Sequence, residues 1–133
     1  MVFVDSNVPM YVAGRDHPLR ERARRFLERA RAGDVDICTS TEVLQEILYR
    51  YAALKRLDLA AAVYDLFVQL CPTVLPVTLA DTDRAKMLLT SVRGISARDA
   101  VHAAVMLNHD VSEIATFDEG FSGVDGVERV SLE

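Results

Sequence analysis

The sequence has only two cysteines, and neither has the spacing of a zinc site or a disulfide framework. Cys38 and Cys71 each lie in an apolar stretch, with no second cysteine nearby. Isolated cysteines of this kind behave as small buried hydrophobic residues. A chain of 133 residues can hold an apolar core without cross-links. We therefore expect both thiols to be reduced and buried.

Long uncharged apolar runs are also missing, which excludes a membrane-spanning helix. The chain starts directly with the apolar residues Val2 to Val4, and neither the basic region nor the cleavage site of a signal peptide accompanies them. We expect a cytoplasmic protein. Half of the residues are hydrophobic and a quarter are charged, as in a globular protein, and the length predicts one domain over residues 1–133.

Lysine is scarce, and the formal net charge is -5. An acidic average argues against a nucleic-acid partner, because such proteins usually carry a basic surface. The positive charge is concentrated, however, since seven of the thirteen arginines fall between Arg15 and Arg31. This stretch predicts either a basic patch beside an acidic site or a solvated helix face, and charge alone favours the second.

Short apolar segments alternate with segments of helical periodicity. Strands are expected at residues 2–4, 36–38, 73–77, 113–116 and 127–130. Helices are expected just after residue 6 and at residues 18–33, 39–56, 58–70, 79–92 and 96–108. This order predicts an α/β fold, a three-layer α/β/α sandwich with a mainly parallel central sheet. In such sheets, functional groups gather beyond the carboxyl ends of the strands.

The first two candidate site residues are Asp5 and Glu46. Asp5 follows the first expected strand directly, where it can act as a helix N-cap or as a ligand. Glu46 has aliphatic neighbours, so its carboxylate needs a counter-charge, which either Arg50 or a metal ion can supply. Glu42 has capping-box spacing with Thr39, and we assign it to structure.

The other two candidates are Asp99 and Asp118. Asp99 lies in the first turn of an expected helix made mostly of small or apolar residues, and its spacing from Ser96 also fits a helix cap. Asp118 follows the fourth expected strand and can form a turn or join a site, together with the Thr116 hydroxyl. His102 lies one turn after Asp99 and can reach the same cleft, but a lone helical histidine more often packs locally. We do not assign it to metal.

Together, these four acids predict a site for a divalent cation, which none of them predicts alone. Carboxylates that gather in one place repel each other and raise each other's pKa. A divalent cation relieves that repulsion, and ligands that are all oxygen favour Mg²⁺ or Mn²⁺ over zinc. Such ions can activate water and stabilise the leaving oxygen in phosphodiester cleavage. The pattern therefore predicts a metal-dependent nuclease with Asp5, Glu46, Asp99 and Asp118 as catalytic residues.

The segments VFVDSNV, STEVLQEIL, ARDAVHAAVML and TFDEGF follow one another across nearly the whole chain. Together they resemble the PIN-domain family, and most closely its VapC-type toxins. The resemblance implies an Mg²⁺- or Mn²⁺-dependent endoribonuclease with its acids at Asp5, Glu46, Asp99 and Asp118. We take Asp5, Asp99 and Asp118 as the metal ligands. It also implies an RNA substrate, a homodimer, and a cognate VapB-like antitoxin that can insert an arginine among the carboxylates.

Two other functions compete with a nuclease. One is a catalytically silent PIN-like interaction module that uses exposed aromatic residues of the predicted helical hairpin. These aromatic residues are Tyr49, Tyr51, Tyr64 and Phe67. The presence of all four acids disfavours this function. The other is a receiver-like phosphoacceptor domain, which needs a lysine after a late strand. The only lysines, Lys55 and Lys86, fall on expected helices.

Overall fold

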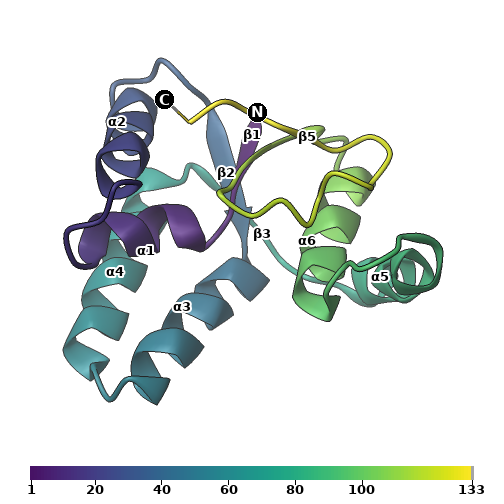
Figure 1. The fold of residues 1–133 in the computed structure, drawn as a ribbon, viewed down its shortest axis with the longest axis horizontal. Helices are drawn as coiled ribbons and strands as arrows, with labels where there is room; N and C mark the ends of the chain where they lie inside the picture. Colours follow the sequence, from purple (N-terminus) through teal and green to yellow (C-terminus); the bar gives the residue numbers. More distant parts are fainter. Residues whose placement is uncertain (133) are drawn as a thin grey trace.

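Strands and helices alternate along the chain in the computed structural model, which describes residues 1–132 (Figure 1). The strands are β1 (Val2–Val4), β2 (Ile37–Ser40), β3 (Thr73–Leu75), β4 (Glu113–Ala115) and β5 (Glu128–Arg129). The helices are α1 (Asn7–Ala13), α2 (Arg20–Arg31), α3 (Thr41–Ala53), α4 (Leu57–Leu70), α5 (Leu79–Ser91) and α6 (Ala97–Asn108). Every expected element is present, with its ends shifted by a few residues at most.

The five strands form one parallel sheet in the order β3-β2-β1-β4-β5. The chain builds outward from β1 through β2 to β3 and then crosses back to place β4 on the other side of β1. The order therefore reverses between β1 and β4. Ligands of open parallel sheets bind beyond the carboxyl ends of the strands at such a point, so the fold directs attention to the residues that follow Val4 and Ala115.

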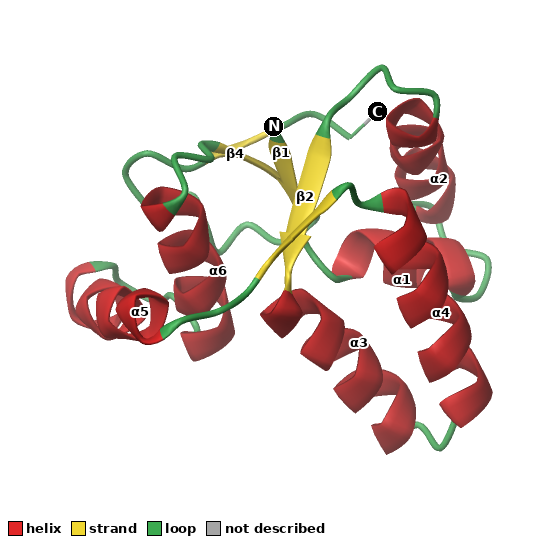
Figure 2. Cartoon of the chain, turned by 180° about the vertical axis from the view of Figure 1, so that it is seen from behind, coloured by secondary structure: helices red, strands yellow, loops and turns green. Residues whose placement is uncertain are grey.

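Helices cover both faces of the sheet, which confirms the three-layer α/β/α architecture. Helices α1, α2 and α4 lie on one side, and α5 and α6 lie on the other (Figure 2). Helix α3 continues directly from β2 and contacts both α4 and α6. Phe3, Val4, Ile114 and Ala115 in the two central strands are fully buried, so the core lies along both faces of β1 and β4. Within residues 1–132, no helix is long and apolar enough to cross a membrane.

The start of α3 differs from the expected capping box between Thr39 and Glu42, which is wrong. Thr39 remains in β2, pairs with Val74 of β3, and donates its hydroxyl to the Val4 carbonyl. Ser40 is the N-cap instead, and its side chain accepts a hydrogen bond from the Val43 amide at 3.3 Å. Sheet pairing therefore extends two residues further than the expected end of this strand at residue 38.

The helical hairpin of α3 and α4 is present, but two details of it were predicted wrongly. Helix α4 begins at Leu57, one residue before the expected start, and Asp58 in its first turn pairs with Arg56 on the surface. The proposed exposed aromatic face is incomplete, since Tyr51 and Phe67 are buried in the core and Tyr64 is half-buried. Tyr49 alone of the four is clearly exposed.

Candidate active site

The four predicted acids line one open cavity of about 410 Å³ at the carboxyl ends of the central strands. Asp5 follows β1, Glu46 comes from α3, Asp99 from the first turn of α6, and Asp118 from the loop after β4. The fold thus brings together side chains that lie as far apart as residues 5 and 118. Because these positions all lie at one edge of the sheet, the four carboxylates share one cavity.

Asp5 is buried and does not act as a helix cap. Ser6 occupies the N-cap position of α1, and no side chain caps that end of the helix. The Asp5 carboxylate instead accepts hydrogen bonds from the Ser6 amide and the Thr116 hydroxyl, both at 2.7 Å. Burial raises the pKa of Asp5, although the nearby His102 charge and the Thr116 hydroxyl oppose that shift.

Thr116 joins the ends of β1 and β4. Its hydroxyl donates to Asp5 and accepts hydrogen bonds from the Asn7 side-chain amide at 3.1 Å and the Asp118 backbone amide at 3.0 Å. Asn7 in turn accepts a bond from the Phe117 amide at 3.3 Å. One hydroxyl therefore sets the relative positions of two acid-bearing segments.

Glu46 is held by residues other than the one its spacing predicts. Its side chain is buried, and one carboxylate oxygen is hydrogen-bonded to the Nε2 atom of His102. The other oxygen lies 3.4 Å from both the Arg98 guanidinium and the Ser6 hydroxyl. Among the described residues, Arg50 makes no ion pair with Glu46, which rules out Arg50 as one of the two counter-charges left open by the sequence. Glu46 faces the cavity and helix α6, whereas Arg50 is exposed and lines a separate groove between α1 and α3.

His102 is a site residue that we left unassigned from the sequence. It is fully buried, contacts Glu46, and lies 3.7 Å from an Asp5 carboxylate oxygen. Burial by itself lowers the pKa of His102, but the hydrogen bond to Glu46 and the Asp5 charge outweigh it, so the pKa is raised. A proton on His102 would therefore act as an internal counter-charge to Glu46 and Asp5. The spacing of three residues between His102 and Asp99 was the available sequence signal.

Asp99 and Asp118 form a second pair of acids, which has no basic partner among the described residues. Both carboxylates lie against Gly120, where an added Cβ atom would lie 2.8 Å from Asp99 Oδ2 and 3.2 Å from Asp118 Oδ1. Burial and the Asp118 charge raise the pKa of Asp99 to about 7. Within residues 1–132, no basic side chain forms an ion pair with either acid.

Both of these acids also have the local roles that their sequence contexts allow. The Asp99 amide donates to the Ser96 hydroxyl at 3.1 Å, so Ser96 caps α6. Asp118 accepts a bond from the Gly120 amide at 2.8 Å, which closes a turn. The cap leaves the Asp99 carboxylate free to face the cavity, and the turn uses Oδ1 of the Asp118 carboxylate.

The residues of this cavity could hold a metal ion. Ligand atoms of Asp5, Glu46 and His102 all lie within 4.8 Å of one another. His102 Nε2 is already hydrogen-bonded to Glu46, however, so these two side chains are partners of one another. The oxygens that still lack a counter-charge belong to Asp99 and Asp118. Carboxylate oxygen is the donor that hard divalent cations prefer.

The arginine-rich helix α2 does not contribute to this cavity. Its arginines are mostly exposed, and several pair along the helix, as in Arg24 with Glu21 and Arg31 with Glu28. Arg98 is the arginine that lines the cavity of the four acids. The stretch from Arg15 to Arg31 is therefore a solvated helix face, as its charge alone favoured, and not a basic patch beside the acids.

Comparison with known proteins identifies the family. Residues 2–127 match the model of the PIN domain. The chain belongs to the PIN-domain family. Ribonuclease VapC13 of Mycobacterium tuberculosis is 40% identical to this PIN domain over 131 residues, which cover 98% of this chain and 100% of that protein. Ribonuclease VapC23 of the same species is 40% identical over 118 residues, with coverage of 89% and 93%.

Solved structures agree on the fold of this PIN domain. The crystal structure of Mycobacterium tuberculosis VapC20, a sarcin–ricin loop cleaving toxin, matches with a TM-score of 0.77 and 22% identity, covering 94% of this chain and 95% of that one. At this identity the likeness shows the architecture alone. The fold and family predicted from the four sequence segments are confirmed.

Proposed function

We propose that this PIN-domain protein is a metal-dependent endoribonuclease and the toxin of a toxin–antitoxin pair. The observation that carries the proposal is the meeting of Asp5, Glu46, Asp99 and Asp118 in one cavity. The likeness to VapC ribonucleases over nearly the whole chain supports it. A catalytically silent module has no need to keep all four acids in one place, so we set that alternative aside.

We assign Asp5, Asp99 and Asp118 as ligands of Mg²⁺, with Mn²⁺ as a substitute. The fit rests on the uncompensated Asp99 and Asp118 carboxylates and on the absence of a side chain at Gly120, which leaves them room to meet. When bound, a divalent cation lowers the pKa of water and stabilises charge on the leaving oxygen.

The chain's own residues orient this chemistry. Thr116 fixes the Asp5 carboxylate, and the Gly120 amide fixes that of Asp118. His102 fixes Glu46 from behind, and we assign Glu46 the positioning of the attacking water at the cavity wall. The raised pKa of Asp99 marks a point where added positive charge is favourable, because a cation there replaces a proton.

We further propose that residues 1–133 act as one nuclease domain in the cytoplasm, as a homodimer restrained by a VapB-like antitoxin. The similarity to VapC proteins supports the antitoxin. The charge of the cavity supports it as well, since a guanidinium from an antitoxin can occupy the place of a metal among the carboxylates.

RNA cleavage with and without divalent cations tests this function. We expect the purified protein to cut RNA internally with Mg²⁺ or Mn²⁺, to stop in EDTA, and to recover when the ion is returned. Asp99→Asn should lower the cleavage rate by about 100-fold or more. Mutating a residue that only hydrogen-bonds to a metal ligand already lowers activity by about 10–100-fold. Asp83→Asn, which makes the same change at an exposed position of α5, should cleave normally. Full cleavage in EDTA or by Asp99→Asn would contradict the proposal.

A further inference from the structure

A cavity lined by four carboxylates repels the polyanion that the proposed function requires it to bind. Each nucleotide of RNA carries a phosphate, and proteins hold those phosphates mainly with Lys and Arg. A divalent cation offsets the repulsion at the scissile phosphate only. The flanking phosphates need positive groups next to the cavity, and the arginines of α2 do not line it.

Arg50 is a positive group in a suitable place. Its side chain is exposed and makes no ion pair or side-chain hydrogen bond with any other residue in 1–132. The acid four residues earlier, Glu46, would normally pair with it. Because Glu46 is held by His102 and Arg98, the Arg50 guanidinium is left without its local partner.

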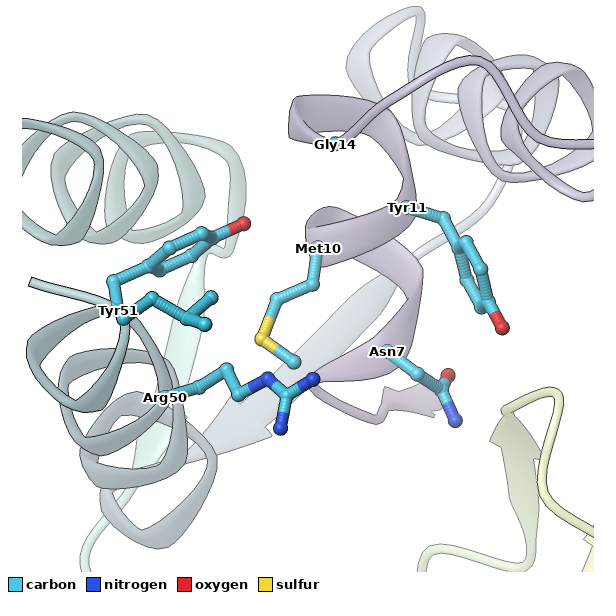
Figure 3. Close-up of a pocket in the computed structure, with 7 residues that line it drawn as sticks. Asn7, Met10, Tyr11, Gly14, Arg50 and Tyr51 are labelled. Atoms are coloured by element: carbon cyan, nitrogen blue, oxygen red, sulfur yellow. The ribbon is translucent and has the colours of Figure 1, made fainter. Parts of the chain in front are cut away.

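Arg50 faces a groove of about 350 Å³ between α1 and α3. Met10 from α1 and Arg50 from α3 extend toward each other across this space (Figure 3). The exposed Leu54 lines the α3 side. Asn7 lines both this groove and the cavity of the four acids, so the two are adjacent.

We propose that the groove between α1 and α3 is a substrate subsite for single-stranded RNA, an inference that rests on the proposed nuclease function. Arg50 binds the phosphate next to the scissile one, with the bidentate geometry that a guanidinium offers to phosphate. The sugar and base of that nucleotide pack against Met10 and Leu54. Asn7 lies at the junction, where its amide is already fixed by Thr116.

Cleavage kinetics on one mapped oligoribonucleotide test the subsite. We expect Arg50→Gln to raise KM about tenfold with little change in kcat, because the residue contacts the substrate away from the reacting atoms. Arg50→Lys should recover part of the loss. Arg29→Gln on α2 removes the same charge from an exposed helix outside the groove and should match the parent protein. Thermal unfolding of each variant should be unchanged, since both side chains are exposed.

Two further measurements distinguish a specific contact between Arg50 and a phosphate from a general electrostatic attraction of RNA. For RNA binding to the inactive Asp99→Asn protein, adding Arg50→Gln should reduce the slope of log affinity against log salt by about 0.7, the value for one lost phosphate contact with a single strand. Shortening the oligonucleotide from one end should abolish the Arg50→Gln effect once the subsite is empty, and shortening from the other end should not.

The possible failures are distinguishable. If the parent protein neither cleaves nor binds RNA, the proposed function fails and the subsite fails with it. If it cleaves RNA and Arg50→Gln leaves KM and the salt slope unchanged, the subsite alone is overturned. An equal loss on every shortened substrate, or a loss of antitoxin binding with RNA binding intact, would also overturn it, the latter in favour of a protein-docking groove.

Discussion

The cavity has two halves, and the carboxylates of each half have different surroundings. In the inner half, Asp5 and Glu46 are buried, and Thr116, Ser6 and His102 supply donors or positive charge to them. In the outer half, Asp99 and Asp118 lie together over Gly120 and form no ion pair with a described residue. The inner carboxylates have partners on several other elements of the protein, whereas the outer ones lack a basic partner among the described residues.

This difference separates folding from metal binding. Buried charges with partners are part of the folded structure, and removing one partner leaves the other uncompensated. Carboxylates that face each other without a cation destabilise the folded state slightly and bind an added cation more strongly for the same reason. The inner half should therefore contribute most to stability, and the outer half, together with Asp5, should contribute most to affinity for the ion.

The largest expected effect contrasts one residue from each half. Asp118→Asn should lower Mn²⁺ affinity by about 100-fold or more, without lowering the free energy of unfolding in EDTA, because it removes repulsion. Thr116→Val should instead lower that free energy by about 1–3 kcal/mol, because it leaves polar partners unsatisfied. Calorimetric Mn²⁺ titration and urea unfolding in EDTA measure the two quantities. Equal losses of stability in both variants would remove the distinction between the halves.

A smaller effect should follow from filling the space between the outer acids. In Gly120→Ala the new methyl group would approach Asp99 Oδ2 to 2.8 Å, so at least one carboxylate must move. We expect a loss of Mn²⁺ affinity of about tenfold, of the size seen when the surroundings of metal ligands are altered. Gly123→Ala is the matched control in the same loop, where the nearest atom is Val92 Cγ1 at 3.4 Å. Unchanged affinity in Gly120→Ala would show that the spacing of the pair does not matter.

The smallest effect concerns pH. The Asp99 pKa is raised from 3.8 to about 7 in the folded protein, so between these values the folded state holds a proton that the unfolded state releases. Stability without metal should therefore fall as pH rises from about 4 to about 7, by a few degrees in Tm. The comparison is between the parent protein and Asp99→Asn, both in EDTA, which cancels the other titrating groups. A constant difference in Tm across this range would contradict the raised pKa.

Much of this organisation could be predicted from local sequence. Asp5 and Asp118 follow strands, and parallel strands place such residues at one edge of the sheet. The alternation of strands and helices predicted a central sheet with a layer of helices on each face. Short-range patterns were sufficient here because both features depend on chain direction and hydrophobic periodicity.

The partners of Glu46 could not be predicted in the same way. Arg50 is its neighbour along the helix, but His102 lies 56 residues away and meets it only after α3 and α6 have packed. A fully buried imidazole in contact with the carboxylate replaces an exposed arginine. The start of α3 shows the same limit, since pairing with β3 kept Thr39 in the sheet. Tertiary contacts decided both cases.

Manganese anomalous scattering from crystals of the protein shows where the ion binds. We expect one or two peaks within about 2 Å of carboxylate oxygens of Asp5, Asp99 and Asp118, and their loss from crystals of Asp118→Asn. A manganese-saturated crystal with no peak in this cavity, or with its peaks only at other surfaces, would contradict this expectation.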